Sequence, residues 1–162
     1  MTVDIPTNQL PVTWIIGATG GIGSAIARRL APRTQLVLSA RNEALLNVLA
    51  SELGAQACTV DVTQPESIQQ ALTSLFHTHG RIDAMVLAVG SILLKSAHRT
   101  SLDEWHATIT QNLHAAFYVM RAVTETVYNP ALAITIVPLI LRIPPWVAVV
   151  PIRRLPYLDR WH

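Results

Sequence analysis

A short apolar strand followed by a glycine-rich turn and a helix constrains the fold of this chain more than any other stretch. Val12 to Ile16 are mostly apolar and β-branched, which is typical of a buried strand. Four closely spaced glycines follow, at positions 17, 20, 21 and 23. Ile22, Ile26 and Leu30 then recur every four residues and predict one buried face of a helix.

A turn of this kind has the properties that a phosphate site needs. Glycine permits positive φ and lets the backbone approach a ligand closely. The free N–H groups and the dipole at a helix N-terminus attract an anion. We therefore predict that the turn binds the pyrophosphate of a dinucleotide, with a purely structural turn as the alternative. The candidate binding residues in it are Gly17, Thr19, Gly20, Gly21, Ile22 and Gly23.

The chain continues as an alternation of strands and helices, which predicts an α/β fold with a Rossmann-like, doubly wound parallel sheet. In the second helix, Leu45, Leu49 and Leu53 predict the buried face and Gly54 the C-cap. Ser101, with a glutamate three residues later, predicts a capping box at the start of a long helix. The expected strands are 35–39, 57–60 and 84–90, and the expected helices are 43–53, 65–76 and 101–123.

The glycine turn resembles the cofactor loop of short-chain dehydrogenases/reductases. Its residues read as Gly17-x-x-x-Gly21-x-Gly23, although Ile16 stands where that family usually has Thr. They also read as Gly17-x-x-Gly20-x-x-Gly23, the spacing of the extended and atypical branches, so the branch stays open. The resemblance covers roughly residues 10 to 126. It implies an oxidoreductase whose residues 1–126 form the region that binds a nicotinamide cofactor.

The corner after the second strand indicates which nicotinamide cofactor to expect. A free ribose 2′-hydroxyl is usually held by an acidic residue about twenty residues beyond the glycine loop. Between Gly23 and Glu43 there is no carboxylate, and Ser39-Ala40-Arg41 occupies the corner. A guanidinium can contact a 2′-phosphate through two charge-assisted hydrogen bonds. Arg41 therefore predicts NADP, with NAD less favoured and a solvent-exposed loop arginine as the alternative.

Further residues match site positions of the family. Asp61-Val62 ends the third strand, where the family places an Asp against the adenine amino group, and a turn or capping role is equally open. Leu87-Ala-Val-Gly90 stands where the family usually carries Asn-Asn-Ala-Gly, so only Gly90 is carried over as a cofactor residue. Asn112 matches the helix asparagine that helps shape the family's proton relay. It is the catalytic candidate, and a polar residue satisfied by a neighbour is the alternative.

The resemblance also implies a catalytic Tyr, Lys and Ser, which the sequence does not supply in the family's pattern. In the family, a Tyr exchanges a proton with the substrate, and a Lys four residues later lowers its pKa. Tyr118, Tyr128 and Tyr157 are followed at that distance by Ala, Leu and Trp, and Lys95 is the only lysine. The family's serine is also missing, because no serine follows Ser101. We expect a truncated or catalytically impaired oxidoreductase, for which a shifted reading frame is one hypothesis.

Residues 127–162 differ in composition from the rest and are interpreted as a proline-rich apolar tail. Six of the ten prolines fall there. Ala133 to Leu141 could form a fifth strand, but Pro138 interrupts it. Arg142 and the prolines disfavour a membrane helix over the same stretch. If residues 130–162 do not supply further strands, the first strand keeps an exposed edge, and we expect the chain to be marginally stable and to self-associate.

Charge and cysteine content limit the partners and the location. The net charge of +2 is too small to indicate nucleic acid or an anionic membrane as a partner. A single cysteine, Cys58, fits a reducing cytoplasm. His77 and His79 lack a third metal ligand and are expected at the surface. The partners that we expect are a nicotinamide cofactor, an unidentified substrate and a homo- or hetero-oligomer.

Two other functions remain as alternatives to an oxidoreductase. The first is a non-catalytic nucleotide-binding or interaction module that pairs with an intact relative. The second is another doubly wound nucleotide binder, such as a methyltransferase. That class generally needs an acidic residue at the end of the second strand, where this chain has Ala40 and Arg41, so it is disfavoured.

Overall fold

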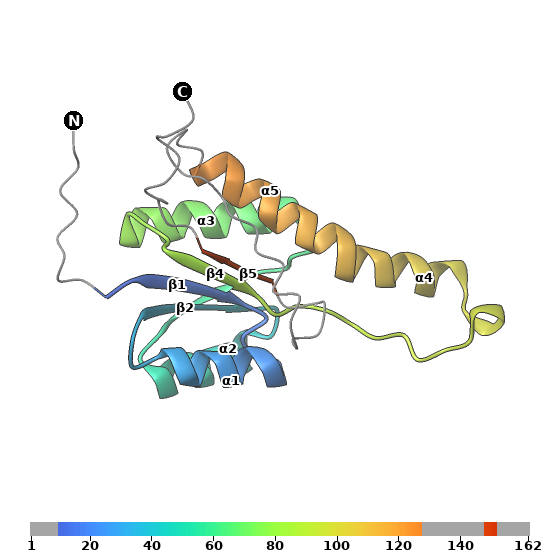
Figure 1. The fold of residues 1–162 in the computed structure, drawn as a ribbon, viewed down its shortest axis with the longest axis horizontal. Coiled ribbons are helices and arrows are strands. Elements are labelled where there is room, and N and C mark those ends of the chain that lie inside the picture. Colours follow the sequence, from blue (N-terminus) through green and yellow to red (C-terminus); the bar gives the residue numbers. More distant parts are fainter. Residues whose placement is uncertain (1–9, 128–147, 152–162) are drawn as a thin grey trace, which may run out of the picture.

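The computed structural model describes residues 10–127 and 148–151, and within these ranges the chain forms one twisted sheet covered by helices on both faces (Figure 1). The sheet order is β3-β2-β1-β4-β5, with four parallel strands and an antiparallel β5. The strands are β1 (Val12–Ile16), β2 (Gln35–Ala40), β3 (Gln56–Thr59), β4 (Ala84–Leu87) and β5 (Ala148–Pro151).

Helices α1 and α2 lie on one face of the sheet, and α3 and α5 lie on the other (Figure 1). This arrangement confirms the doubly wound α/β fold. The helices are α1 (Gly21–Leu30), α2 (Glu43–Leu53), α3 (Pro65–His79), α4 (Leu102–Ile109) and α5 (Ala115–Val127). A 3₁₀ turn, η1 (Ala97–Arg99), precedes α4, and a π-helical turn, η2 (Thr110–His114), joins α4 to α5.

Strands β1 to β4 send alternate side chains into two separate cores, because side chains in a strand point to opposite faces. Trp14 and Ile16 of β1 pack toward α3 and α5, whereas Ile15 packs toward α1 and α2. Trp14 is fully buried, and its indole N–H donates to the Ser39 hydroxyl at 2.9 Å. The bond satisfies a polar group that would otherwise be costly to bury.

The buried helix faces differ in part from those expected. In α1 the buried residues are Gly23 and Ala27, and Ile22 is 44% exposed. In α2 the buried residues are Leu46, Leu49 and Ala50. The expected face position Leu45 is 57% exposed. The expected face is confirmed at Leu49, which is buried, and Ile26, Leu30 and Leu53 pack against the core, whereas Ile22 and Leu45 turn out to be exposed. The buried stripe is therefore shifted toward Ala27 and Leu46, because apolar residues on neighbouring stripes compete for the sheet.

The expectation that the first strand keeps an exposed edge is wrong. The chain returns after β3 to the other side of β1, so β1 pairs with both β2 and β4. The strand beyond β4 is β5, which pairs with all four residues of β4 in antiparallel register. It comes from the segment interpreted as a tail. The candidate strand at 133–141 lies outside the described residues.

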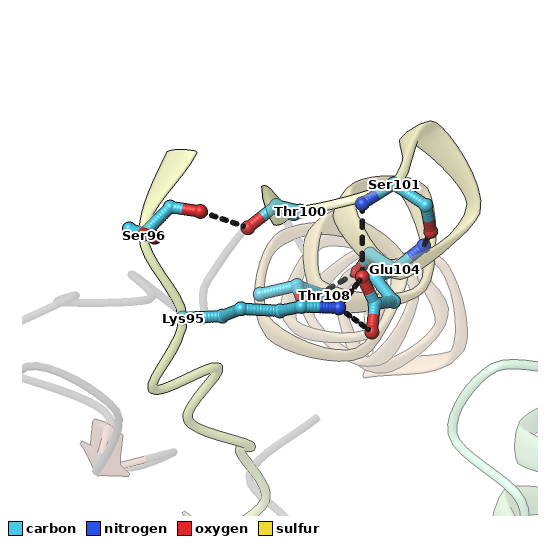
Figure 2. A network of polar contacts seen from close by, with 6 residues as sticks. All are labelled: Lys95, Ser96, Thr100, Ser101, Glu104 and Thr108. Carbon is cyan, nitrogen blue, oxygen red and sulfur yellow. Dashed lines mark hydrogen bonds and ion pairs between the residues drawn. The ribbon is translucent and has the colours of Figure 1, made fainter. Parts of the chain in front are cut away.

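The loop after β4 is fastened to the start of α4 by a polar network (Figure 2). The predicted capping box is confirmed, since the Glu104 N–H donates to the Ser101 hydroxyl at 3.2 Å and the Ser101 N–H donates to the Glu104 carboxylate at 2.9 Å. The Lys95 ammonium donates to both oxygens of the same carboxylate, each at 2.8 Å. These bonds, led by that from Lys95, lower the pKa of Glu104.

No helix in the described part of the chain combines the length and the apolar character that crossing a membrane requires.

Candidate functional site

A cleft runs along the edge of the sheet at which the parallel strands end. Open α/β sheets bind ligands at this edge, where the strand order reverses, and here the reversal lies between β1 and β4. The cleft has a volume of about 190 Å³. Its walls come from the ends of four strands, from the β1–α1 loop and from η2. They consist of Ile16, Gly17, Thr19, Gly20, Ala40, Arg41, Val60, Val62, Ala88, Val89, Gly90 and Gln111.

Gly17 is the position at which the β1–α1 loop requires glycine. Its φ is +86°, in the left-handed region that favours glycine. A Cβ there would also lie 2.5 Å from the carbonyl oxygen of Ala88, at the end of β4. The N–H groups of Gly17 and Ala18 donate to the Ser39 carbonyl at 2.7 and 3.0 Å. The loop is thus held tightly between the ends of β2 and β4.

The first turn of α1 presents its backbone to the cleft region. Gly20 is the N-cap and makes no side-chain capping bond. Within residues 10–127, the N–H groups of Gly21, Ile22 and Gly23 donate to no backbone acceptor. Such N–H groups, with the helix dipole, form an anion site. Of the predicted loop residues, Gly17, Thr19 and Gly20 line the cleft, whereas Gly21, Ile22 and Gly23 lie in the helix turn beside it.

Arg41 follows β2 directly and lines the cleft as an exposed side chain. In the described part of the chain, Arg28, Arg81 and Arg121 each pair with a carboxylate, and Arg41 does not. Its guanidinium is therefore available to an anionic ligand at the end of β2. The Arg41 charge also makes a small contribution to the lowered pKa of Asp61, after the bonds from Thr63.

Asp61 is engaged in a turn, and Val62 lines the cleft. One Asp61 carboxylate oxygen accepts from the Thr63 N–H at 3.0 Å and from the Thr63 hydroxyl at 2.8 Å. The Asp61 N–H donates to the Ser67 hydroxyl at 3.1 Å. The bond from the Thr63 N–H is the main reason why the pKa of Asp61 is lowered. These contacts fit a turn role for Asp61, which the sequence analysis gave as the alternative to binding the adenine amino group.

Gly90 and Asn112 lie close together at the β4 side of the site. Gly90 lines the cleft. The Asn112 side chain is fully engaged: its oxygen accepts from the Ser91 N–H at 2.9 Å, and its nitrogen donates to the Ser91 and Thr108 carbonyls at 3.0 and 2.9 Å. Asn112 therefore joins the β4–α4 loop to η2 across 21 positions of the sequence.

Gln111 is a cleft residue that the sequence did not indicate. It sits in the π-helical turn, one position before Asn112. No local pattern marks that turn, so only the folded backbone brings the residue to the cleft. Among the described residues, no group of three His, Cys, Asp or Glu side chains could hold a metal ion.

Comparisons with known proteins agree with this architecture. The family model described as short chain dehydrogenase matches residues 11–135. An uncharacterized oxidoreductase of Staphylococcus epidermidis is 32% identical over 114 residues, which cover 68% of this chain and 50% of the relative. An NADP-dependent 3-hydroxy acid dehydrogenase of Salmonella typhi is 33% identical over 116 residues, covering 69% of this chain and 47% of that protein.

Solved structures of other proteins are also similar to this chain over about half of their own length. A variant of actinorhodin polyketide ketoreductase, solved with NADPH, superposes with a TM-score of 0.69 at 27% identity, covering 72% of this chain and 47% of that one. The chain spans about half the length of the curated relatives it matches. The residues matched by the family model, 11–135, include the glycine loop, the cleft lining and the four parallel strands. The chain belongs to the short-chain dehydrogenase family, a family of oxidoreductases.

Proposed function

We propose that the cleft binds NADP(H) and that NAD(H) binds less tightly. The observation that carries this proposal is the position of Arg41, an unpaired guanidinium within the described residues that lines the cleft at the end of β2. No carboxylate occurs between Gly23 and Glu43 to hold a free ribose 2′-hydroxyl. A guanidinium suits a 2′-phosphate because it offers two parallel charged donors.

The names of two related proteins support the same cofactor. The Salmonella typhi relative is named an NADP-dependent dehydrogenase, and the ketoreductase structure contains NADPH. Both match this chain over about half of their own length. A cytoplasmic location, which suits this cofactor and the single Cys58, forms part of the proposal.

Each wall of the cleft has a part in this proposal. The N–H groups of the first turn of α1 would hold the pyrophosphate, with Gly17 and Gly23 keeping the loop close to the strands. Arg41 would bind the 2′-phosphate, and Asp61 and Val62 would border the adenine. Gly90 would let the backbone approach the cofactor. NADPH supplies a hydride when bound, and Asn112 would act by positioning η2 beside it.

We further propose that turnover by these residues alone is slight. The 162 residues contain no Tyr followed four residues later by Lys, which is the proton-transfer pair that the family resemblance implies. Ketone reduction requires a proton as well as a hydride. We therefore expect cofactor binding with little or no reduction of simple ketones, and the substrate is not assigned.

A second candidate is a nucleotide-binding module that pairs with an intact relative or with a second copy. Large apolar side chains are exposed along the helical arm from α4 to α5, where Leu102, Trp105, Leu113 and Phe117 are 53% to 76% exposed. Exposed apolar side chains that are grouped on a surface are typical of a site that binds another protein. Size-exclusion chromatography with light scattering, alone and mixed with a full-length relative, distinguishes a monomer from either assembly.

The proposed cofactor is tested by titrating NADPH and NADH into the purified chain and following nicotinamide fluorescence. We expect NADPH to bind about 10- to 100-fold more tightly, because a charge-assisted pair contributes roughly 1.5–3 kcal/mol. Arg41→Asp should reverse the preference. Arg29→Asp, at an exposed position of α1 outside the cleft lining, is the matched control and should preserve it. Equal affinities of the parent chain for both cofactors would refute the assignment.

A further inference from the structure

We propose that Lys95 is a latch for the loop between β4 and α4. Its ammonium charge holds residues 92–101 against the start of α4, and acylation of its amine releases them. Lys95 lies outside the cleft lining, so the latch does not depend on which cofactor the cleft binds.

Two polar anchors hold the loop, and they differ in charge. The first is Asn112, an uncharged side chain that binds the N–H and the carbonyl of Ser91 at 2.9 and 3.0 Å. The second is Glu104, whose two carboxylate oxygens each accept from the Lys95 ammonium at 2.8 Å (Figure 2). Loss of the Lys95 charge would therefore open the second anchor and leave the first one closed.

Little else fastens the segment between the two anchors. Within the described part of the chain, the N–H groups of residues 92–96 donate no hydrogen bond. Ile92 and Leu94 are 66% and 92% exposed, so packing of these two side chains does not fix the backbone, and Leu93 is only partly covered. The position of the segment therefore depends on its anchors.

The Glu104 carboxylate joins the loop to the helix because it serves both. It accepts from the Ser101 N–H at 2.9 Å, as part of the capping box, and from Lys95. The bond from Lys95 is the largest cause of the lowered pKa of Glu104, so the carboxylate stays ionised and the bonds are charge-assisted. An acylated lysine has one N–H in place of three and no charge, and the charge-assisted pair is then lost.

The chain offers a single lysine amine to an acylating group, because Lys95 is its only lysine. Its side chain is 33% exposed. After the ammonium loses a proton to water, the nitrogen attacks the carbonyl carbon of an acyl thioester. The C–N bond forms, the C–S bond breaks, and the thiol leaves with a second proton from the nitrogen. The resulting amide does not become charged at neutral pH, so the loop stays released.

Hydrogen exchange of the full chain, resolved by residue, tests the latch. Lys95→Gln removes the charge, and Lys95→Arg keeps it. We expect the N–H groups of Arg99, Thr100 and Ser101 to exchange about two- to fivefold faster in Lys95→Gln, the upper range for a partly exposed ion pair, and at the parent rate in Lys95→Arg. The Ser91 N–H should keep the parent rate in both variants, because its anchor is uncharged.

Acetylation with the N-hydroxysuccinimide ester of acetic acid produces the modified chain directly. Intact mass should show acetyl groups on Lys95 and the α-amino group of the parent, and on the α-amino group alone in Lys95→Arg. Exchange at residues 99–101 should then accelerate in the parent only. Arg121→Gln removes an ion pair with Glu125 on α5, is the matched control, and should leave the loop at the parent rate.

A second variant opens the latch from the other side. Glu104→Gln keeps an acceptor for the Ser101 N–H but has no charge, and it should accelerate exchange as Lys95→Gln does, with little further effect when the two are combined. Parent rates at residues 99–101 in both single variants overturn the latch. So does an equal acceleration in the loop and in β1, which would mean a loss of global stability. Failure of NADPH to bind would refute the proposed function and leave this test unaffected.

Discussion

A Cβ added at Gly23 would lie 2.2 Å from the carbonyl oxygen of Gly17. The first turn of α1 is therefore pressed against the same loop residue whose φ of +86° lets β1 turn into the helix. Gly21, two residues earlier in the same turn, would place its Cβ in open space, with no atom within 4 Å. Gly17 lies in the loop, and Gly21 and Gly23 lie in the helix turn that follows it. The three glycines have different structural requirements, and this difference can be tested.

Gly23→Ala should unfold more easily and bind NADPH poorly, whereas Gly21→Ala should do neither. At Gly23 the added methyl must displace the Gly17 carbonyl, and overpacking of this kind costs roughly 1–3 kcal/mol. At Gly21 alanine favours the helix by about 0.5–1 kcal/mol. Urea unfolding and NADPH titration of the two variants give the comparison. Equal behaviour of both variants would contradict the close packing of α1 on the loop.

Asn112→Leu should lower the free energy of unfolding by about 1–3 kcal/mol, because it leaves the Ser91 N–H and the Thr108 carbonyl without their partner. NADPH binding should weaken with it, since η2 would no longer be joined to the β4–α4 loop. Asn47→Leu, on an exposed position of α2, is the control and should leave both quantities nearly unchanged. A stable Asn112→Leu that binds NADPH normally would show that the contact with Ser91 is dispensable.

Asp61 should make folding stability depend on pH in the acid range. Its pKa is lowered below the ordinary 3.8, chiefly by the bond from the Thr63 N–H. A carboxyl with a depressed pKa in the folded state contributes stability above its unfolded pKa and loses it as the pH falls through the folded pKa. We expect the free energy of unfolding to fall below about pH 4, and less steeply in Asp61→Asn, which keeps an acceptor but does not titrate. Equal slopes from pH 5 to pH 2 would argue against this role.

The pairing of β5 with β4 can be tested by comparing two truncations. A chain that ends at residue 151 keeps β5, and one that ends at residue 147 removes it and leaves the edge of β4 unpaired. Both lack residues 152–162, so the difference between them isolates the four-residue strand. We expect the shorter chain to melt at a lower temperature and to form larger species in size-exclusion chromatography. Indistinguishable melting and elution would mean that β5 does not protect the sheet.

The full chain provides the reference for this comparison. Its sequence predicts marginal stability and self-association, on the argument that a proline-rich tail cannot complete the sheet. Because β5 pairs with β4, the β4 edge of the sheet is better protected than that argument assumed. Thermal unfolding and light scattering of residues 1–162 decide between a sharp monomeric transition and a broad one with association.

Much of the local structure followed from interactions among residues near one another in the chain. The β1 strand and the α2 helix have the predicted bounds, and Gly54 adopts the left-handed C-cap conformation, with a φ of +61°. The Ser101 capping box formed as predicted. Each of these depends on a side chain or a backbone preference within about four residues, so the sequence alone contains the information.

Other features depend on residues far apart in the chain, and only the tertiary structure decided them. The phase of the buried stripe on α2 was set by the sheet, which buried Leu46 in preference to Leu45. The partners of Asn112 and the cleft position of Gln111 came from a loop 21 residues away and from a π turn. The strand beside β4 came from beyond residue 147. The sequence determined a glycine loop, an arginine after β2 and a doubly wound fold, because these are local patterns. The tertiary structure determined which side chains share the cleft, because that depends on contacts between distant segments that no local periodicity encodes.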